Sequence, residues 1–267
     1  MSRYAAMFER LRARHEGAFG AFAMLGDPDL ERSAAILDAL VEGGADMLEV
    51  GIPFSDPVAD GPVIQAAAVR ALAGGTRTAD CFALLAAFRA RHPEVPVGIL
   101  TYANLVVAQG RDNSFLFYRM AAEAGVDSVL VADVPLLEAA PFLASAQAAG
   151  VAPVLIAAPN TPPETLAGIA RAGAGYTYCV ARAGVTGADE EVRFNAPLLQ
   201  ALNELGAPPP VLGFGISKPR HVQLALEAGA AGVISGSAIV HLIAQQPDPA
   251  AAVRSFVAEM KAATRQA

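Results

Sequence analysis

Two carboxylates stand out in the stretch LEVGIPFSDPVADGP, which runs from Leu48 to Pro62. Glu49 lies inside an apolar run typical of a buried strand, and Asp60 lies in the proline-rich loop that follows. A carboxyl group removed from water has a raised pKa and can exchange protons near neutral pH. The pair therefore predicts general acid–base catalysis. The alternatives are a structural hydrogen bond or an arginine partner for Glu49 and a helix cap for Asp60.

The other residue types that often act in catalysis lack the positions or spacings that their chemistry requires. The lysines, Lys218 and Lys261, fall outside the expected strands, which disfavours a Schiff-base aldolase. The histidines show no metal-binding spacing, and Cys81 and Cys179 form no metal or redox motif. The sequence contains neither a G-x-S-x-G elbow nor a Walker loop. We therefore expect catalysis without a metal and without a cofactor in this chain.

Short β-rich runs alternate with longer Ala- and Leu-rich runs of helical periodicity. The expected strands are residues 21–25, 47–51, 97–102, 128–132, 153–158, 176–181, 211–214 and 232–235. Repeated βα units favour a parallel (β/α)8 TIM barrel with an extra N-terminal helix, formed by residues 1–267 as a single domain. A doubly wound open sheet is the alternative, but no G-x-G-x-x-G motif follows the first strand.

Strand periodicity also places the first carboxylate. Side chains alternate along a strand, so Met47, Glu49 and Gly51 should share one face, and Leu48 and Val50 the other. We expect Glu49 to face the barrel interior near the carboxyl end of its strand. Barrel enzymes build their active sites at that end.

Glycines follow the last two expected strands. Gly215 lies in VLGFGIS, and Gly236 and Ser237 lie in VISGSAIV. Glycine lets backbone N–H groups approach an anion, and a helix N-terminus adds partial positive charge. These loops predict a phosphate site. The stretch ARAGVTGADEE, residues 181–191, predicts a lid over it, with an ordinary surface loop as the alternative.

Composition limits the partners of the protein. The net charge of −7, with no basic cluster, argues against nucleic acid as a partner. No apolar run reaches the roughly 18 residues needed to span a bilayer, which argues against a membrane protein. The first residues lack the apolar core of a secretion signal, so we expect a cytoplasmic protein.

Six motifs together resemble one enzyme family. In chain order they are LEVGIPFSDPVADGPVIQ, GILTYANLV, GVDSVLVADVP, ARAGVTG, GFGIS and ISGSAIV, and they resemble the tryptophan synthase α subunit family over nearly the whole chain. The resemblance implies a barrel lyase of tryptophan biosynthesis. Such a lyase performs a retro-aldol cleavage of indole-3-glycerol phosphate to indole and glyceraldehyde 3-phosphate. It also implies an α2β2 heterotetramer with a β subunit that carries pyridoxal phosphate.

The resemblance implies roles for individual residues. Glu49 would be the catalytic acid–base group, Asp60 would interact with the indole nitrogen, and Arg182 and Thr186 would belong to the lid. The implied indole pocket consists of Phe22, Leu100, Tyr102, Leu130, Ala132, Ile156 and Tyr178. The implied phosphate cradle consists of Gly187, Gly215, Gly236 and Ser237.

Three positions depart from the family pattern: Met24, Ala158 and Ala181 stand where threonine, proline and serine are common. Other functions stay open. One is a self-sufficient lyase that releases free indole, and another is a barrel that activates a β partner without catalysis. A third is a different phosphate-binding barrel isomerase. The intact pair Glu49 and Asp60 argues against a non-catalytic barrel.

Overall fold

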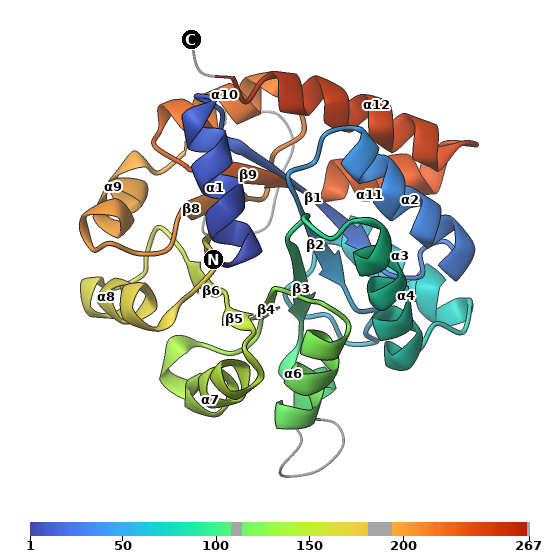
Figure 1. Cartoon of the computed structure of the whole chain (residues 1–267), viewed down its shortest axis with the longest axis horizontal. Helices are drawn as coiled ribbons and strands as arrows, with labels where there is room; N and C mark the ends of the chain where they lie inside the picture. The colour runs from blue at the N-terminus through green and yellow to red at the C-terminus, as the bar shows by residue number, and fades with distance from the viewer. Residues whose placement is uncertain (108–113, 181–193, 266–267) are drawn as a thin grey trace.

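The central feature of the computed structural model is one parallel sheet ringed by helices (Figure 1), and the structure describes residues 1–107, 114–180 and 194–265. Every strand pairing in the described sheet is parallel. The strands are β1 (Ala18–Met24), β2 (Met47–Gly51), β3 (Val97–Thr101), β4 (Ser128–Val131), β5 (Ala152–Pro153), β6 (Leu155–Ala157), β7 (Thr177–Val180), β8 (Pro210–Gly213) and β9 (Gly232–Ser235).

The sheet closes on itself through a split strand. Its order is β5-β4-β3-β2-β1-β9-β8-β7-β6, so β5 and β6 are the ends of the ladder, and Val154 alone separates them in the chain. The predicted (β/α)8 barrel is thereby confirmed. The single strand expected at residues 153–158 is wrong, because Pro153 has no N–H to donate and the chain changes partners there, from β4 to β7.

Helices cover the outside of the barrel (Figure 1). They are α1 (Arg3–Ala13), α2 (Leu30–Glu42), α3 (Pro62–Ala73), α4 (Thr78–Arg91), α5 (Ala103–Val107), α6 (Ser114–Glu123), the short 3-10 helix η1 (Leu136–Glu138), α7 (Ala140–Ala149), α8 (Pro163–Ala172), α9 (Ala196–Glu204), α10 (Pro219–Glu227), α11 (Ser237–Gln245) and α12 (Pro249–Ala262). Among the described residues, no helix has the length and apolar character to cross a membrane.

The N-terminal helix α1 is the extra helix that the sequence predicted, and it lies across the amino-terminal end of the barrel (Figure 1). Its apolar stripe is buried and includes Tyr4 and Met7. Asp127, just before β4, ties this end together: it accepts hydrogen bonds from Arg3 of α1 at 2.9 Å and from Arg89 of α4 at 2.8 Å. Because α1 covers this end of the barrel, we expect the site to open at the other end.

The two faces of the strands separate as expected. Leu48 and Val50 pack outward against the helices, and Met47 packs inside the barrel. Inside, large residues of one strand lie beside smaller ones of the next. Phe22 of β1 pairs with Glu49 of β2, which pairs in turn with Gly98 of β3. This alternation fills the interior, and the space that a side chain at Gly98 would take is occupied by the Ser128 and Tyr4 hydroxyls.

Candidate active site

Glu49 lies inside the barrel on β2 and is only 3% exposed. The hydroxyl of Tyr176, the residue just before β7, donates a 2.6 Å hydrogen bond to Glu49 Oε1. A second hydrogen-bonded pair lies nearby and consists of the Tyr4 hydroxyl and Ser128 Oγ, which are 2.8 Å apart. Within the described part of the chain, Glu49 has no arginine or lysine partner, so the ion-pair alternative finds no support there.

The surroundings of Glu49 set its acidity. Burial raises its pKa from 4.5 to about 7, because a charged carboxylate is poorly solvated there. The hydrogen bond from Tyr176 opposes this rise, and the charge of Asp60 adds to it. Glu49 therefore changes its protonation state in the pH range that proton transfer requires.

Asp60 lies in the loop between β2 and α3, and it does not cap the helix. The cap position is Gly61, and no side chain makes a capping hydrogen bond there. The helix-cap alternative for Asp60 is therefore wrong. The backbone of Asp60 is held instead, since its N–H donates to the Pro57 carbonyl at 3.0 Å and its carbonyl accepts from Gln65 at 2.8 Å. The side chain is left for other partners.

Asp60 also has an altered acidity. Burial raises its pKa from 3.8 to about 6, and the nearby Tyr102 hydroxyl lowers it in part. Asp60 and Glu49 are close enough that the charge of Asp60 affects Glu49. Asp60 is thus the stronger acid of the pair and ionises first as the pH rises.

Most of the predicted indole-pocket residues gather beside these carboxylates. Phe22, Leu130 and Tyr178 belong to one buried interior cluster, and Leu100 and Ala132 pack against it. Tyr178 lies directly over Gly213, where any side chain would collide with its ring. The structure therefore brings these apolar and aromatic groups to one wall of the interior. An apolar wall of this kind suits a planar ring.

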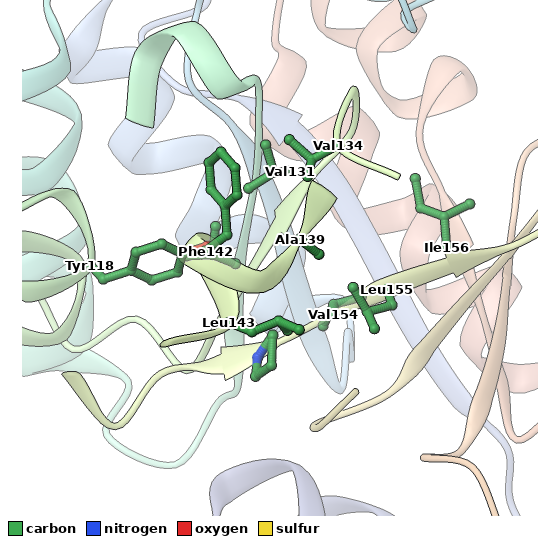
Figure 2. A pocket seen from close by; sticks show the side chains of 11 residues that line it. Tyr118, Val131, Val134, Ala139, Phe142, Leu143, Val154, Leu155 and Ile156 are labelled. Atoms are coloured by element: carbon green, nitrogen blue, oxygen red, sulfur yellow. The ribbon is translucent and has the colours of Figure 1, made fainter. Parts of the chain in front are cut away.

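Tyr102 and Ile156 complete the predicted pocket in different ways. Tyr102 is buried, and its ring stacks on Phe54 with centroids 5.5 Å apart. Ile156 is 36% exposed and pairs in register with Tyr178. Figure 2 shows Ile156 and Leu155 projecting from opposite sides of β6. The crevice at this seam between β4 and β6 holds about 30 Å³, room for one or two water molecules, so it is no indole site.

The loops after β8 and β9 are linked to each other. Ser235 Oγ donates a 2.6 Å hydrogen bond to the Ile216 carbonyl, which joins the end of β9 to the loop that contains Gly215. The helix α11 begins at Ser237, its cap is Gly236, and no described side chain caps it. Its first N–H groups are therefore available to an anion. The other phosphate and lid candidates, Arg182, Thr186 and Gly187, and the departure Ala181 lie outside the described residues.

Motif reasoning missed three residues of the site: Tyr4, Tyr176 and Phe214. Tyr4 and Tyr176 form the polar floor below Glu49, with ring centroids 5.4 Å apart. Period-2 alternation would have placed Tyr176 on the same face as Tyr178. Phe214 follows β8 with φ of 69° and contacts the Tyr178 ring edge-on at 6.2 Å. Nothing in the local sequence signals this left-handed conformation.

The fold and the site together define a class. A closed parallel barrel holds a buried carboxyl group of near-neutral pKa, a second carboxylate, an apolar wall and uncapped helix N–H groups. This combination is typical of barrel enzymes, and it offers groups suited to acid–base chemistry and N–H donors suited to an anion.

Comparisons with known proteins identify the family. The family model for the tryptophan synthase alpha chain matches residues 8–266, and the chain belongs to that family. The tryptophan synthase alpha chain of Shewanella amazonensis is 55% identical, covering 99% of this chain and 100% of its own. That of Escherichia coli is 53% identical, with the same coverage. A tryptophan synthase structure from Mycobacterium tuberculosis superimposes with a TM-score of 0.89 at 31% identity, covering 100% of this chain and 99% of that one.

Proposed function

We propose that Glu49 and Asp60 carry out the reaction of this lyase family. The reaction is the retro-aldol cleavage of indole-3-glycerol phosphate to indole and glyceraldehyde 3-phosphate, a step of tryptophan biosynthesis. The observation that carries the assignment is a glutamate 3% exposed inside the barrel whose pKa is raised to about 7. Such a group can give up and take back a proton within one turnover.

The chemistry divides between the two carboxyl groups. Glu49 begins protonated and delivers its proton to ring carbon 3, which breaks the conjugation of the ring and places positive charge on the ring nitrogen. Asp60 begins ionised and stabilises that charge. Glu49, now a carboxylate, removes the proton from the hydroxyl next to the breaking bond. The carbon–carbon bond then cleaves, its electron pair restores the indole ring, and Glu49 is protonated again.

The remaining residues bind the two ends of the substrate. The wall formed by Phe22, Leu130 and Tyr178 supports a place for the indole ring, with Leu100, Tyr102, Ala132 and Ile156 completing it. The uncapped start of α11 at Gly236 and Ser237, with the adjacent Gly215, supports a phosphate site. Gly187, Thr186 and Arg182 would add to it from the lid.

The proposed assembly is an α2β2 tryptophan synthase. In it, this cytoplasmic chain of one domain, residues 1–267, carries no cofactor, and the β subunit carries pyridoxal phosphate. Indole leaves at the carboxyl end of the barrel, so the β subunit should dock there. Two apolar side chains support this face: Val58 after β2 is 80% exposed, and Leu137 after β4 is 89% exposed. Both side chains follow strands at their carboxyl ends, and exposed apolar groups gathered at one end of a barrel favour a protein interface there.

The test mixes the purified chain with indole-3-glycerol phosphate, with and without a β subunit, and follows indole release. Glu49→Gln should lower the rate by about 10²–10⁴-fold and Asp60→Asn by about 10²–10³-fold, with the fold intact by circular dichroism. Glu123→Gln is the matched control, because Glu123 lies on the exposed surface of α6 and should have no effect.

Two results would contradict parts of this proposal. Undiminished cleavage by Glu49→Gln would remove its acid–base role. Rapid turnover by the isolated chain, with no gain from a β subunit, would favour the self-sufficient lyase.

A further inference from the structure

Tyr102 presents a buried polar group without a partner. Its side chain is 2% exposed, and its hydroxyl has no partner of regular hydrogen-bond geometry among the described residues, although Asp60 lies close enough for the hydroxyl to lower its pKa. An unpaired buried hydroxyl is costly, so each case in a folded protein calls for an explanation. The apolar pocket explains the burial of the Tyr102 ring but leaves its hydroxyl unexplained.

The ring of Tyr102 packs against the loop that contains Asp60. It stacks on Phe54 with an interplanar angle of 29° and a centroid separation of 5.5 Å. Phe54 and Asp60 both belong to the segment between β2 and α3. On the other side, the Ala103 N–H donates to Asp133 Oδ1 at 2.8 Å, which fixes the backbone directly after Tyr102. The hydroxyl is therefore held in a defined place beside this loop.

We propose that Tyr102 is a positioning residue whose hydroxyl donates a hydrogen bond to the Asp60 carboxylate and so selects its ionised form for catalysis. The inference rests on the proposed function, in which ionised Asp60 stabilises positive charge on the ring nitrogen. It gives the otherwise unpaired hydroxyl its partner in the working site.

The charges around Asp60 support this role. The charge of Asp60 raises the pKa of Glu49 on β2 and of Tyr178 on β7, and the charge of Asp133 raises the pKa of Tyr102. All of these groups are acidic, and no described cationic side chain affects the pKa of Asp60. Among the described residues, the Tyr102 hydroxyl offsets part of the rise in that pKa caused by burial. Its own pKa is raised, chiefly by burial, so it stays a protonated donor.

The experiment compares Tyr102→Phe with the wild type in complex with a β subunit. Phenylalanine keeps the ring and its stacking on Phe54 and removes only the hydroxyl. We expect the acidic limb of the pH profile of kcat/KM to move upward by about one pH unit, since Asp60 then ionises at higher pH. Tyr118→Phe is the matched control: Tyr118 is a buried tyrosine outside the barrel, and its loss should leave the profile unchanged.

A second measurement does not depend on activity. Carbon-13 NMR of the Asp60 carboxyl group in the full chain should show its titration midpoint rising in Tyr102→Phe. An unchanged midpoint would overturn the inference even if the enzyme cleaves its substrate as proposed. A raised KM with no shift of either titration would also overturn it, because the hydroxyl would then bind the substrate. Failure of the proposed lyase function would show instead as wild-type protein that releases no indole, while the NMR shift persists.

Discussion

The hydrogen bond from Tyr176 to Glu49 should set the alkaline limit of the reaction. The Tyr176 hydroxyl donates to Glu49 Oε1 at 2.6 Å, and both groups are buried. Burial and the charge of Glu49 raise the pKa of Tyr176, so Tyr176 remains a donor throughout the working pH range. Tyr176→Phe removes the hydroxyl and keeps the ring that packs on Tyr4.

The size of the effect follows from the bond that is lost. A hydrogen bond to a charged group contributes about 1.5–3 kcal/mol, which corresponds to about one to two pKa units. The protonated form of Glu49 also accepts from the hydroxyl, so only the difference between the two bonds counts. We therefore expect the pKa of Glu49 to rise by about one unit from its value of about 7.

The assay is the pH profile of kcat/KM for indole release. Glu49 must begin protonated, so activity should fall as the pH rises through its pKa. In Tyr176→Phe this alkaline limb should move upward by about one pH unit, while the acidic limb, set by Asp60, stays in place. Tyr118→Phe again serves as the control for loss of a buried phenol.

A profile that coincides with the wild type would show that Tyr176 does not stabilise ionised Glu49. A shift of the alkaline limb toward lower pH would be a stronger contradiction. It would mean that the hydroxyl favours the protonated form of Glu49.

Three further predictions concern stability and assembly. Burial raises the pKa of Glu49 from 4.5 to about 7, so the free energy of unfolding should fall by on the order of 3 kcal/mol as the pH rises through that range. In urea unfolding, Glu49→Gln should recover this free energy at about pH 8 but not at about pH 4. Asp127→Ala removes the carboxylate that pairs with Arg3 and Arg89 and should cost about 3 kcal/mol, whereas Glu42→Ala at its exposed ion pair with Arg254 should cost under about 1 kcal/mol; equal losses would contradict this. Leu137→Asp should weaken β-subunit binding in a titration, and Leu205→Asp at the opposite end should not; the reverse order would refute the docking face.

The barrel was predictable because its signals are local and repeated. The alternation of strand and helix, and the period-2 pattern around Glu49, each depend on residues close in the chain, and both predictions hold in the structure. The exception is the fifth strand. Its break after Pro153 depends on which neighbours each half pairs with, and the local sequence does not contain that information.

The environment of the site was less predictable because it forms across long separations in sequence. Tyr176 and Glu49 are 127 positions apart, and Tyr4 and Ser128 are 124 apart. Patterns along the chain showed that Glu49 faces inward, but they could not show which hydroxyl it meets. The case of Asp60 is similar: the motif DGP suits a helix cap, yet in the structure Gly61 takes that position.

The different surroundings of two similar side chains give them opposite roles. Burial raises the pKa of both carboxyl groups. The pKa of Glu49 rises to about 7, and that of Asp60 rises to about 6. Between these values Asp60 is mainly ionised while Glu49 is still mainly protonated. That is the pairing that the cleavage needs, with a proton to give and a negative charge to hold. Each ionisation also makes the other harder, because the charge of Asp60 raises the pKa of Glu49. Ionised Asp60 therefore favours the protonated form of Glu49 until the proton is transferred to the substrate.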